Sequence, residues 1–282
     1  MEKTLKKYFP FFVLPTFLTF AIVFLIPFVL GVGLSFTKFT TIFNAKFVGI
    51  SNYTKAFASN QRFIQAFGFT TIFTIVTIIT INIIAFAIAL ALTREIKGSN
   101  LFRTVFFMPN LIGGIVLGYT WQVMLNSVLL KLIGKGLLAS ETYGFWGLVL
   151  LTNWQLIGYM MVIYIAGLQN VPQSLIEAAK IDGASKWTIL KNVTIPMVMP
   201  SITICLFLTL TNSFKLYDQN LALTAGAPLY KTEMLAMNIV NTMFAKVGFE
   251  GVGQAKAFIF FIMVAAIAYV QLKFTRDREV EN

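Results

Sequence analysis

Residues 143–196 read YGFWGLVLLTNWQLIGYMMVIYIAGLQNVPQSLIEAAKIDGASKWTILKNVTIP. The first half of this stretch, residues 143–168, contains no Asp, Glu, Lys or Arg. A helix needs about 20 apolar residues to cross the hydrocarbon core of a bilayer. The second half carries charged residues and ends in a proline. The stretch therefore predicts a membrane-spanning helix followed by a structured polar loop.

Five further apolar stretches lie outside this one, and none of them contains Asp or Glu. Their predicted bounds are 11–36, 66–92, 104–127, 196–217 and 257–274. The chain as a whole is 57% hydrophobic and only 12% charged, about half the charge of a soluble domain. This composition excludes an ordinary soluble enzyme, a disordered tail and a disulfide-rich secreted module. We expect an all-α membrane protein with six transmembrane helices in a single transmembrane domain, residues 1–282.

Several chemistries lack the residues that they need. The sequence has no His and a single Cys, Cys205, so His-based catalysis, most zinc sites and an intrachain disulfide are excluded. It also lacks the G-x-x-x-x-G-K-[ST] phosphate loop of ATP-binding proteins. We therefore expect no enzymatic activity, no metal site and no cofactor bound by this chain. If the chain moves a solute uphill, the energy must come from another chain.

Basic residues between the apolar stretches indicate how the chain is oriented. We interpret residues 11–36 as an uncleaved first span, because the run is too long for a signal peptide. An even number of spans places both termini on one side, and four of the five Arg residues fall on that side. Cytoplasmic loops are enriched in Lys and Arg, so both termini are predicted to be cytoplasmic. The net charge of +11 is spread over many loops, which favours lipid headgroups over nucleic acid as its partner.

Uncharged polar residues recur at helical spacing inside two of the predicted spans. Thr152, Gln155 and Tyr159 share one face of the fourth span, and Thr209, Asn212 and Ser213 share one face of the fifth. Such residues often hydrogen-bond neighbouring helices to one another. The alternative is a pathway for an uncharged, hydroxyl-rich solute. The spans lack the acidic residues and His that ion-coupled transporters often use, but an ion-coupled transporter or a channel stays open as an alternative.

The loop at residues 170–196 is predicted to be a helix–turn–helix. Ser174 and Glu177 have the spacing of a capping box, Gly183 suits the left-handed end of a helix, and Ser185 can cap a second helix. From the residues alone, this loop could be an amphipathic hairpin that rests on lipid.

The same loop carries a motif. Glu177-Ala178-Ala179 is followed after three residues by Gly183, and after nine more by Val193-x-Ile195-Pro196. This pattern resembles the EAA loop of ABC importer permeases, EAA-x3-G-x9-I-x-L-P, with conservative changes at Val193 and Ile195. Residues 47–53, 102–109 and 223–228 also resemble the carbohydrate-uptake branch of that family, so the resemblance covers nearly the whole chain. Ala225 and Ala227 depart from the glycines of the family pattern.

The resemblance implies a permease that forms half of a pore in the bacterial plasma (inner) membrane. It implies a second homologous permease subunit, two ATPase subunits that bind ATP and Mg, and an extracytoplasmic solute-binding protein. The solute implied is a sugar or oligosaccharide, with a glycerol phosphodiester as runner-up that would require a basic residue such as Lys215. The ATPase-coupling residues implied are Glu177, Ala178, Ala179, Asp182 and Gly183. The substrate-pathway residues are Thr152, Gln155, Tyr159, Thr209, Asn212 and Ser213.

Overall fold

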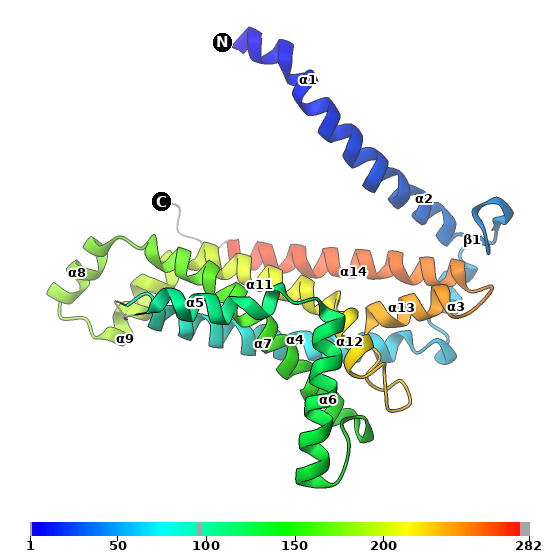
Figure 1. The fold of residues 1–282 in the computed structure, drawn as a ribbon. Helices are drawn as coiled ribbons and strands as arrows, with labels where there is room; N and C mark the ends of the chain where they lie inside the picture. The colour runs from blue at the N-terminus through cyan, green and yellow to red at the C-terminus, as the bar shows by residue number, and fades with distance from the viewer. Residues whose placement is uncertain (1, 95–97, 277–282) are drawn as a thin grey trace. The chain divides into compact units, whose positions relative to one another are not determined.

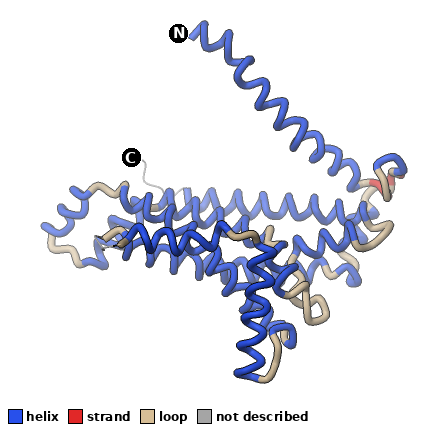
Figure 2. Tube along the Cα trace, viewed as in Figure 1, coloured by secondary structure: helices blue, strands red, loops and turns tan. Residues whose placement is uncertain are grey.

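The computed structural model describes residues 2–94 and 98–276, and this part of the chain is almost entirely helical (Figures 1 and 2). The helices are α1 (Glu2–Phe20), α2 (Ile26–Ser35), α3 (Ser51–Ala56), α4 (Phe63–Leu92), α5 (Ser99–Phe107), α6 (Gly114–Ile133), α7 (Glu141–Gln169), α8 (Gln173–Ile181), α9 (Lys186–Ile189), α10 (Ile195–Met197), α11 (Met199–Phe214), α12 (Asp218–Leu223), α13 (Leu235–Phe244) and α14 (Glu250–Arg276). Two short strands, β1 (Thr37–Lys38) and β2 (Lys46–Phe47), pair in antiparallel fashion. The prediction of an all-α membrane protein is confirmed.

Five described helices are long and apolar enough to span a membrane, and a sixth span is added if one bent pair counts as a single crossing. The first of them combines α1, the π-helical turn η1 (Ala21–Leu25) and α2 into one continuous rod (Figure 1). The spans predicted at 66–92 and 143–168 correspond to α4 and α7 within three residues at each end. Long apolar runs therefore located these helices well.

The span predicted at 104–127 is broken, which corrects the expectation of one continuous helix. Helix α5 ends at Phe107, a 3-10 turn η4 (Met108–Leu111) follows, and α6 starts at Gly114. Pro109 lies in the 3-10 turn, and Ile112 is extended with φ −87° and ψ 132°. Proline has no N–H to donate and its ring disturbs the preceding turn, so the helix ends here although the sequence stays apolar.

The span predicted at 196–217 is also interrupted. The helical segments Lys186–Met197 and Met199–Phe214 meet at an angle of 70°. Pro200 lies in the first turn of α11 and cannot donate a hydrogen bond to residue 196. The π-helical turn η6 (Leu190–Thr194) lies just before Pro196, which likewise has no N–H to donate. Helix α11 therefore starts at Met199, and Pro196 belongs to the segment before the bend.

The contacts divide the chain into two units, one of which combines the residues up to Phe63 with Ile239–Ile262. In this unit the Asn52 side chain donates to the carbonyls of Ser35 at 2.9 Å and Thr37 at 2.8 Å. Gly251 lies against the Thr37 carbonyl and leaves no room for a Cβ. Helix α14 starts at Glu250, seven residues before the predicted span 257–274. Lys256 is fully buried within this helix and donates to Thr242 Oγ1 at 2.7 Å.

The second unit comprises Ile64–Asn238 and the chain from Met263 onward. Helix α7 is the centre of this unit. Of its 29 residues, 14 are buried, against two of the 20 residues of α6. One apolar cluster around α7 contains Ile81, Met160 and Cys205, and the Cys205 thiol donates to the Met160 carbonyl at 3.7 Å. A second cluster contains Phe73 and Leu148. The packing of α4 and α11 against α7 builds the framework of the site described next.

Candidate functional site

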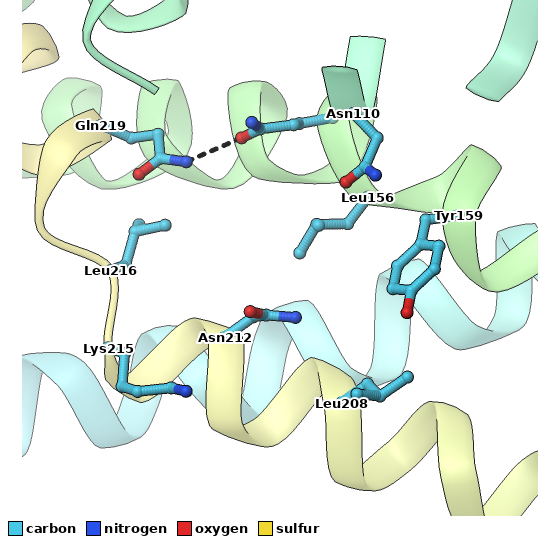
Figure 3. Close-up of a pocket in the computed structure, with 9 residues that line it drawn as sticks. Asn110, Leu156, Tyr159, Leu208, Asn212, Lys215, Leu216 and Gln219 are labelled. Carbon is cyan, nitrogen blue, oxygen red and sulfur yellow. Dashed lines mark hydrogen bonds between the residues drawn. The ribbon is translucent and has the colours of Figure 1, made fainter. Parts of the chain in front are cut away.

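A cavity of about 510 Å³ lies in the second unit, between α7, α11, the 3-10 turn η4 and the start of α12 (Figure 3). Polar groups dominate its lining: four carboxamides, a phenol and an ammonium group, with three leucines between them. The lining residues are Asn110, Gln155, Leu156, Tyr159, Leu208, Asn212, Lys215, Leu216 and Gln219. No carboxylate from the described residues lines it.

Helical spacing places most of these side chains. Gln155 and Tyr159 are four residues apart on α7, and Leu208 and Asn212 are four residues apart on α11, so each pair shares one helix face. Lys215 is the C-cap of α11, one residue beyond its last turn. Asn110 comes from the 3-10 turn that interrupts the predicted third span. Figure 3 shows Tyr159 and Asn212 projecting toward the space between their helices.

A chain of hydrogen bonds crosses one side of the cavity. The Gln219 amide donates to Gln155 Oε1 at 2.8 Å, and the Gln155 amide donates to the carbonyl of Ile112 at 3.3 Å. Gln155 is only 7% exposed. The carbonyl of Ile112 is available because the extended residue ends the 3-10 turn. The broken helix thus supplies an acceptor that orients a buried amide in the cavity wall.

Three of the six predicted pathway residues line the cavity: Gln155, Tyr159 and Asn212. The other three pack into helix interfaces. Thr209 donates to the Cys205 carbonyl at 2.7 Å and accepts from the Asn82 amide at 3.3 Å. Ser213 shares a 2.9 Å hydrogen bond with Thr77 of α4. Thr152 is fully buried, and its hydroxyl has no hydrogen-bond partner among the described residues. The role of all six residues in transport stays a prediction.

Sequence reasoning missed Asn110, Leu208 and Gln219. Asn110 follows Pro109 inside an apolar run, and that proline was the available signal of a break. Gln219 lies in α12, beyond the predicted end of the fifth span. Lys215, the basic residue that an anionic solute would require, lies on the cavity wall.

The loop at 170–196 is a pair of helices, α8 and α9, as its pattern indicated. Gly183 adopts φ +78° between them, and the N–H of Ala184 donates to the Ala179 carbonyl at 2.9 Å. Ser185 Oγ accepts from the Thr188 N–H at 3.2 Å, so the predicted cap is confirmed. The predicted capping box is wrong: α8 starts at Gln173, which makes Ser174 its second residue, and no side chain caps it.

The α8–α9 pair presents an open surface. Glu177, Ala178, Asp182 and Gly183 are exposed, and Ala179 is half-buried. Two large apolar side chains are also uncovered, Ile181 at 86% and Trp187 at 70% exposure. An exposed apolar group beside charged residues is typical of a docking surface. The described residues contain no cluster of acidic residues and Cys that could hold a metal ion.

The fold and the site define a multi-pass helical membrane protein with a polar cavity and an exposed helix pair at the ends of its spans. Residues 83–276 match the family described as the binding-protein-dependent transport system inner membrane component. The match includes α8, α9 and every cavity residue. The chain belongs to this family, and it is a transport permease, as the loop motif indicated.

Two relatives are similar over almost their full length. The probable starch degradation products transport system permease protein AmyD of Thermoanaerobacterium thermosulfurigenes is 44% identical, covering 96% of this chain and 94% of the relative. The multiple sugar-binding transport system permease protein MsmF of Streptococcus mutans is 30% identical, covering 99% of both. A bacterial ABC transporter involved in import of the polysaccharide alginate has the same fold, with a TM-score of 0.81, 19% identity and 98% coverage of both chains.

Proposed function

We propose that this chain forms half of the pore of an ABC importer that takes up a neutral sugar or oligosaccharide. The observation that carries the proposal is the cavity between α7 and α11, lined by carboxamides and a tyrosine without a carboxylate. Amides donate to and accept from hydroxyl groups, and aromatic and aliphatic side chains contact the apolar faces of sugar rings. The names of the two relatives refer to starch products and to multiple sugars, which supports the same class of solute.

The energy source in this proposal is a pair of ATPase subunits that bind ATP and Mg, because the chain has no phosphate loop of its own. The α8–α9 pair is the contact to these subunits. Glu177, Ala178, Ala179, Asp182 and Gly183 form the coupling surface, on a helix–turn–helix that can move as a unit. A second, homologous permease completes the pore, and an extracytoplasmic binding protein delivers the solute.

The orientation proposed for the chain places α8 and α9 in the cytoplasm of a bacterial cell. The excess of Arg in the segments on that side supports it. Both termini then lie in the cytoplasm of a plasma-membrane protein.

The test is purification of the chain in mild detergent, identification of the subunits that accompany it, and uptake in proteoliposomes with the companion binding protein. We expect an ATPase to copurify and labelled malto-oligosaccharides to accumulate only with ATP inside. A glycerol phosphodiester, presented in parallel, tests the anionic alternative that Lys215 suggests. Uptake driven by an ion gradient without an ATPase, or selective uptake of the phosphodiester, would contradict the proposal.

A further inference from the structure

A second cavity, of about 810 Å³, lies where α4 and α7 end and the α8–α9 pair begins. It is distinct from the candidate solute site, because the two share no lining residue. Three cationic side chains contribute to its wall: Arg94 just beyond α4, Lys180 on α8 and Lys186 on α9. Among the residues that the structure describes, no acidic side chain lines it.

Most of the remaining wall is apolar, which distinguishes the cavity from a site for a small soluble anion; its uncharged polar members are Thr93, Gln169, Gln173 and Thr194. Leu90 and Leu168 come from the last turns of α4 and α7, the ends of two membrane spans. Ile176 of α8 and Trp187 of α9 also contribute to this wall, together with Val171, Ile189 and Leu190. A ligand that fits the whole cavity therefore needs an anionic head and an apolar tail, held at the depth where a span leaves the bilayer.

We propose that this cavity binds an anionic phospholipid, with the headgroup phosphate among Arg94, Lys180 and Lys186 and an acyl chain against the leucines and Trp187. Basic pockets between helices at the end of a span are known sites for anionic headgroups. Trp side chains prefer the membrane interface, where an apolar ring meets polar headgroups. The lipid contacts both α8 and α9, so it ties the helix pair to the ends of α4 and α7. This site does not depend on which solute the permease carries.

The test uses the complete transporter, reconstituted in nanodiscs of phosphatidylcholine with increasing amounts of phosphatidylglycerol. Brominated phosphatidylglycerol quenches nearby Trp residues, and the quenching lost in a Trp187→Phe variant measures lipid at this cavity. The charge variant is Lys180→Gln with Lys186→Gln. Its matched control is Lys131→Gln with Lys135→Gln, which removes the same charge from two exposed lysines that line neither cavity.

We expect brominated phosphatidylglycerol to quench Trp187 at lower mole fractions than brominated phosphatidylcholine does. The charge variant should weaken this preference by about fivefold per cation removed, and the control should leave it within about twofold. Equal quenching by the two lipids, or equal loss in variant and control, overturns the proposal.

Two further arms separate the lipid from other occupants. Competition by inorganic phosphate at millimolar concentration would make the cavity a soluble-anion site and overturn the proposal. Loss of Trp187 quenching when the ATPase subunits are present, and its return when they are stripped off, would assign the cavity to the ATPase instead. Quenching that persists in both states supports the lipid.

Discussion

Asn212 and Ser213 are neighbours on α11 with opposite surroundings. The Asn212 side chain lines the cavity, whereas Ser213 is fully buried and bonded to Thr77. Asn212→Ala should lower sugar uptake up to about tenfold, because one lost hydrogen bond is worth about 0.5–1.5 kcal/mol. The KM for solute delivered by the binding protein, measured in proteoliposomes, checks this prediction.

Ser213→Ala is the matched control for the Asn212 variant. It should leave the KM unchanged and lower the thermal stability, since it removes a partner of Thr77. If both variants changed the KM equally, the assignment of the cavity as the solute site would be wrong.

The polar residues of α7 show how much of the site the sequence could predict. Spacing placed Thr152, Gln155 and Tyr159 on one side of α7, and they do lie there. The structure separates them, since Gln155 and Tyr159 line the cavity and Thr152 is enclosed by packing. Periodicity identifies a helix face, but the neighbour that covers each part of that face depends on tertiary packing. Gln219 lies in the six-residue helix α12, which is too short to show a periodicity that would reveal it.

At the scale of elements, α5 packs so closely on α7 that only a glycine fits at the point of contact. A Cβ at Gly158 would overlap the carbonyl oxygen of Phe106. Gly158→Ala should therefore lower the free energy of unfolding by about 1–3 kcal/mol or more, because a backbone carbonyl cannot move aside like a flexible side chain. Thermal unfolding of the purified chain measures this. Gly68→Ala, where nothing lies within 4 Å of the added Cβ, should be neutral or stabilising, and an equal loss at both positions would contradict the packing argument.

The turn between α8 and α9 depends on the left-handed backbone of Gly183, at φ +78°. Gly183→Val should distort this turn at a cost of about 1–2 kcal/mol, and Gly183→Asn should be tolerated far better, because Asn adopts this conformation more readily. Both added side chains have space, since nothing lies within 4 Å of a Cβ here. We expect the Val variant to reduce the uptake obtained per ATP hydrolysed and the Asn variant to remain close to the parent. Normal coupling in the Val variant would show that the turn does not transmit movement.

At the scale of elements, apolar length predicted α4 and α7 well but could not locate the two breaks. Proline alone does not mark a break in a membrane helix, because neighbouring groups can satisfy the freed backbone. Pro27 lies in the first turn of α2 within a continuous rod. Pro109 and Pro200, in contrast, lie where one helical segment ends and the next begins. The difference at Pro109 is the nearby Gly113-Gly114 pair and the extended Ile112. The bend beside Pro200 separates α11 from the helical segment that leads back to α9 and α8.

For the whole molecule, the proposed orientation predicts where reporters function. Alkaline phosphatase fused after Lys135 should be active and green fluorescent protein fused there should be dark, because phosphatase needs an oxidising compartment to form its disulfides. Fusions after Arg276, the last described residue of α14, should show the reverse. Activity assays and fluorescence of the four fusions in bacterial cells provide the measurement. Active phosphatase at both sites would exclude an orientation with the C-terminus inside.

The buried Cys205 thiol is a natural reporter of movement between α7 and α11. The thiol is fully buried and lies against the Met160 carbonyl, at the seam between α11 and α7. Alkylation requires a thiolate that a reagent can reach, so this closed arrangement protects the thiol. The same two helices form opposite walls of the cavity, and any movement that parts them exposes the sulfur. The rate at which a maleimide modifies the unaltered protein during turnover therefore counts how often that seam opens.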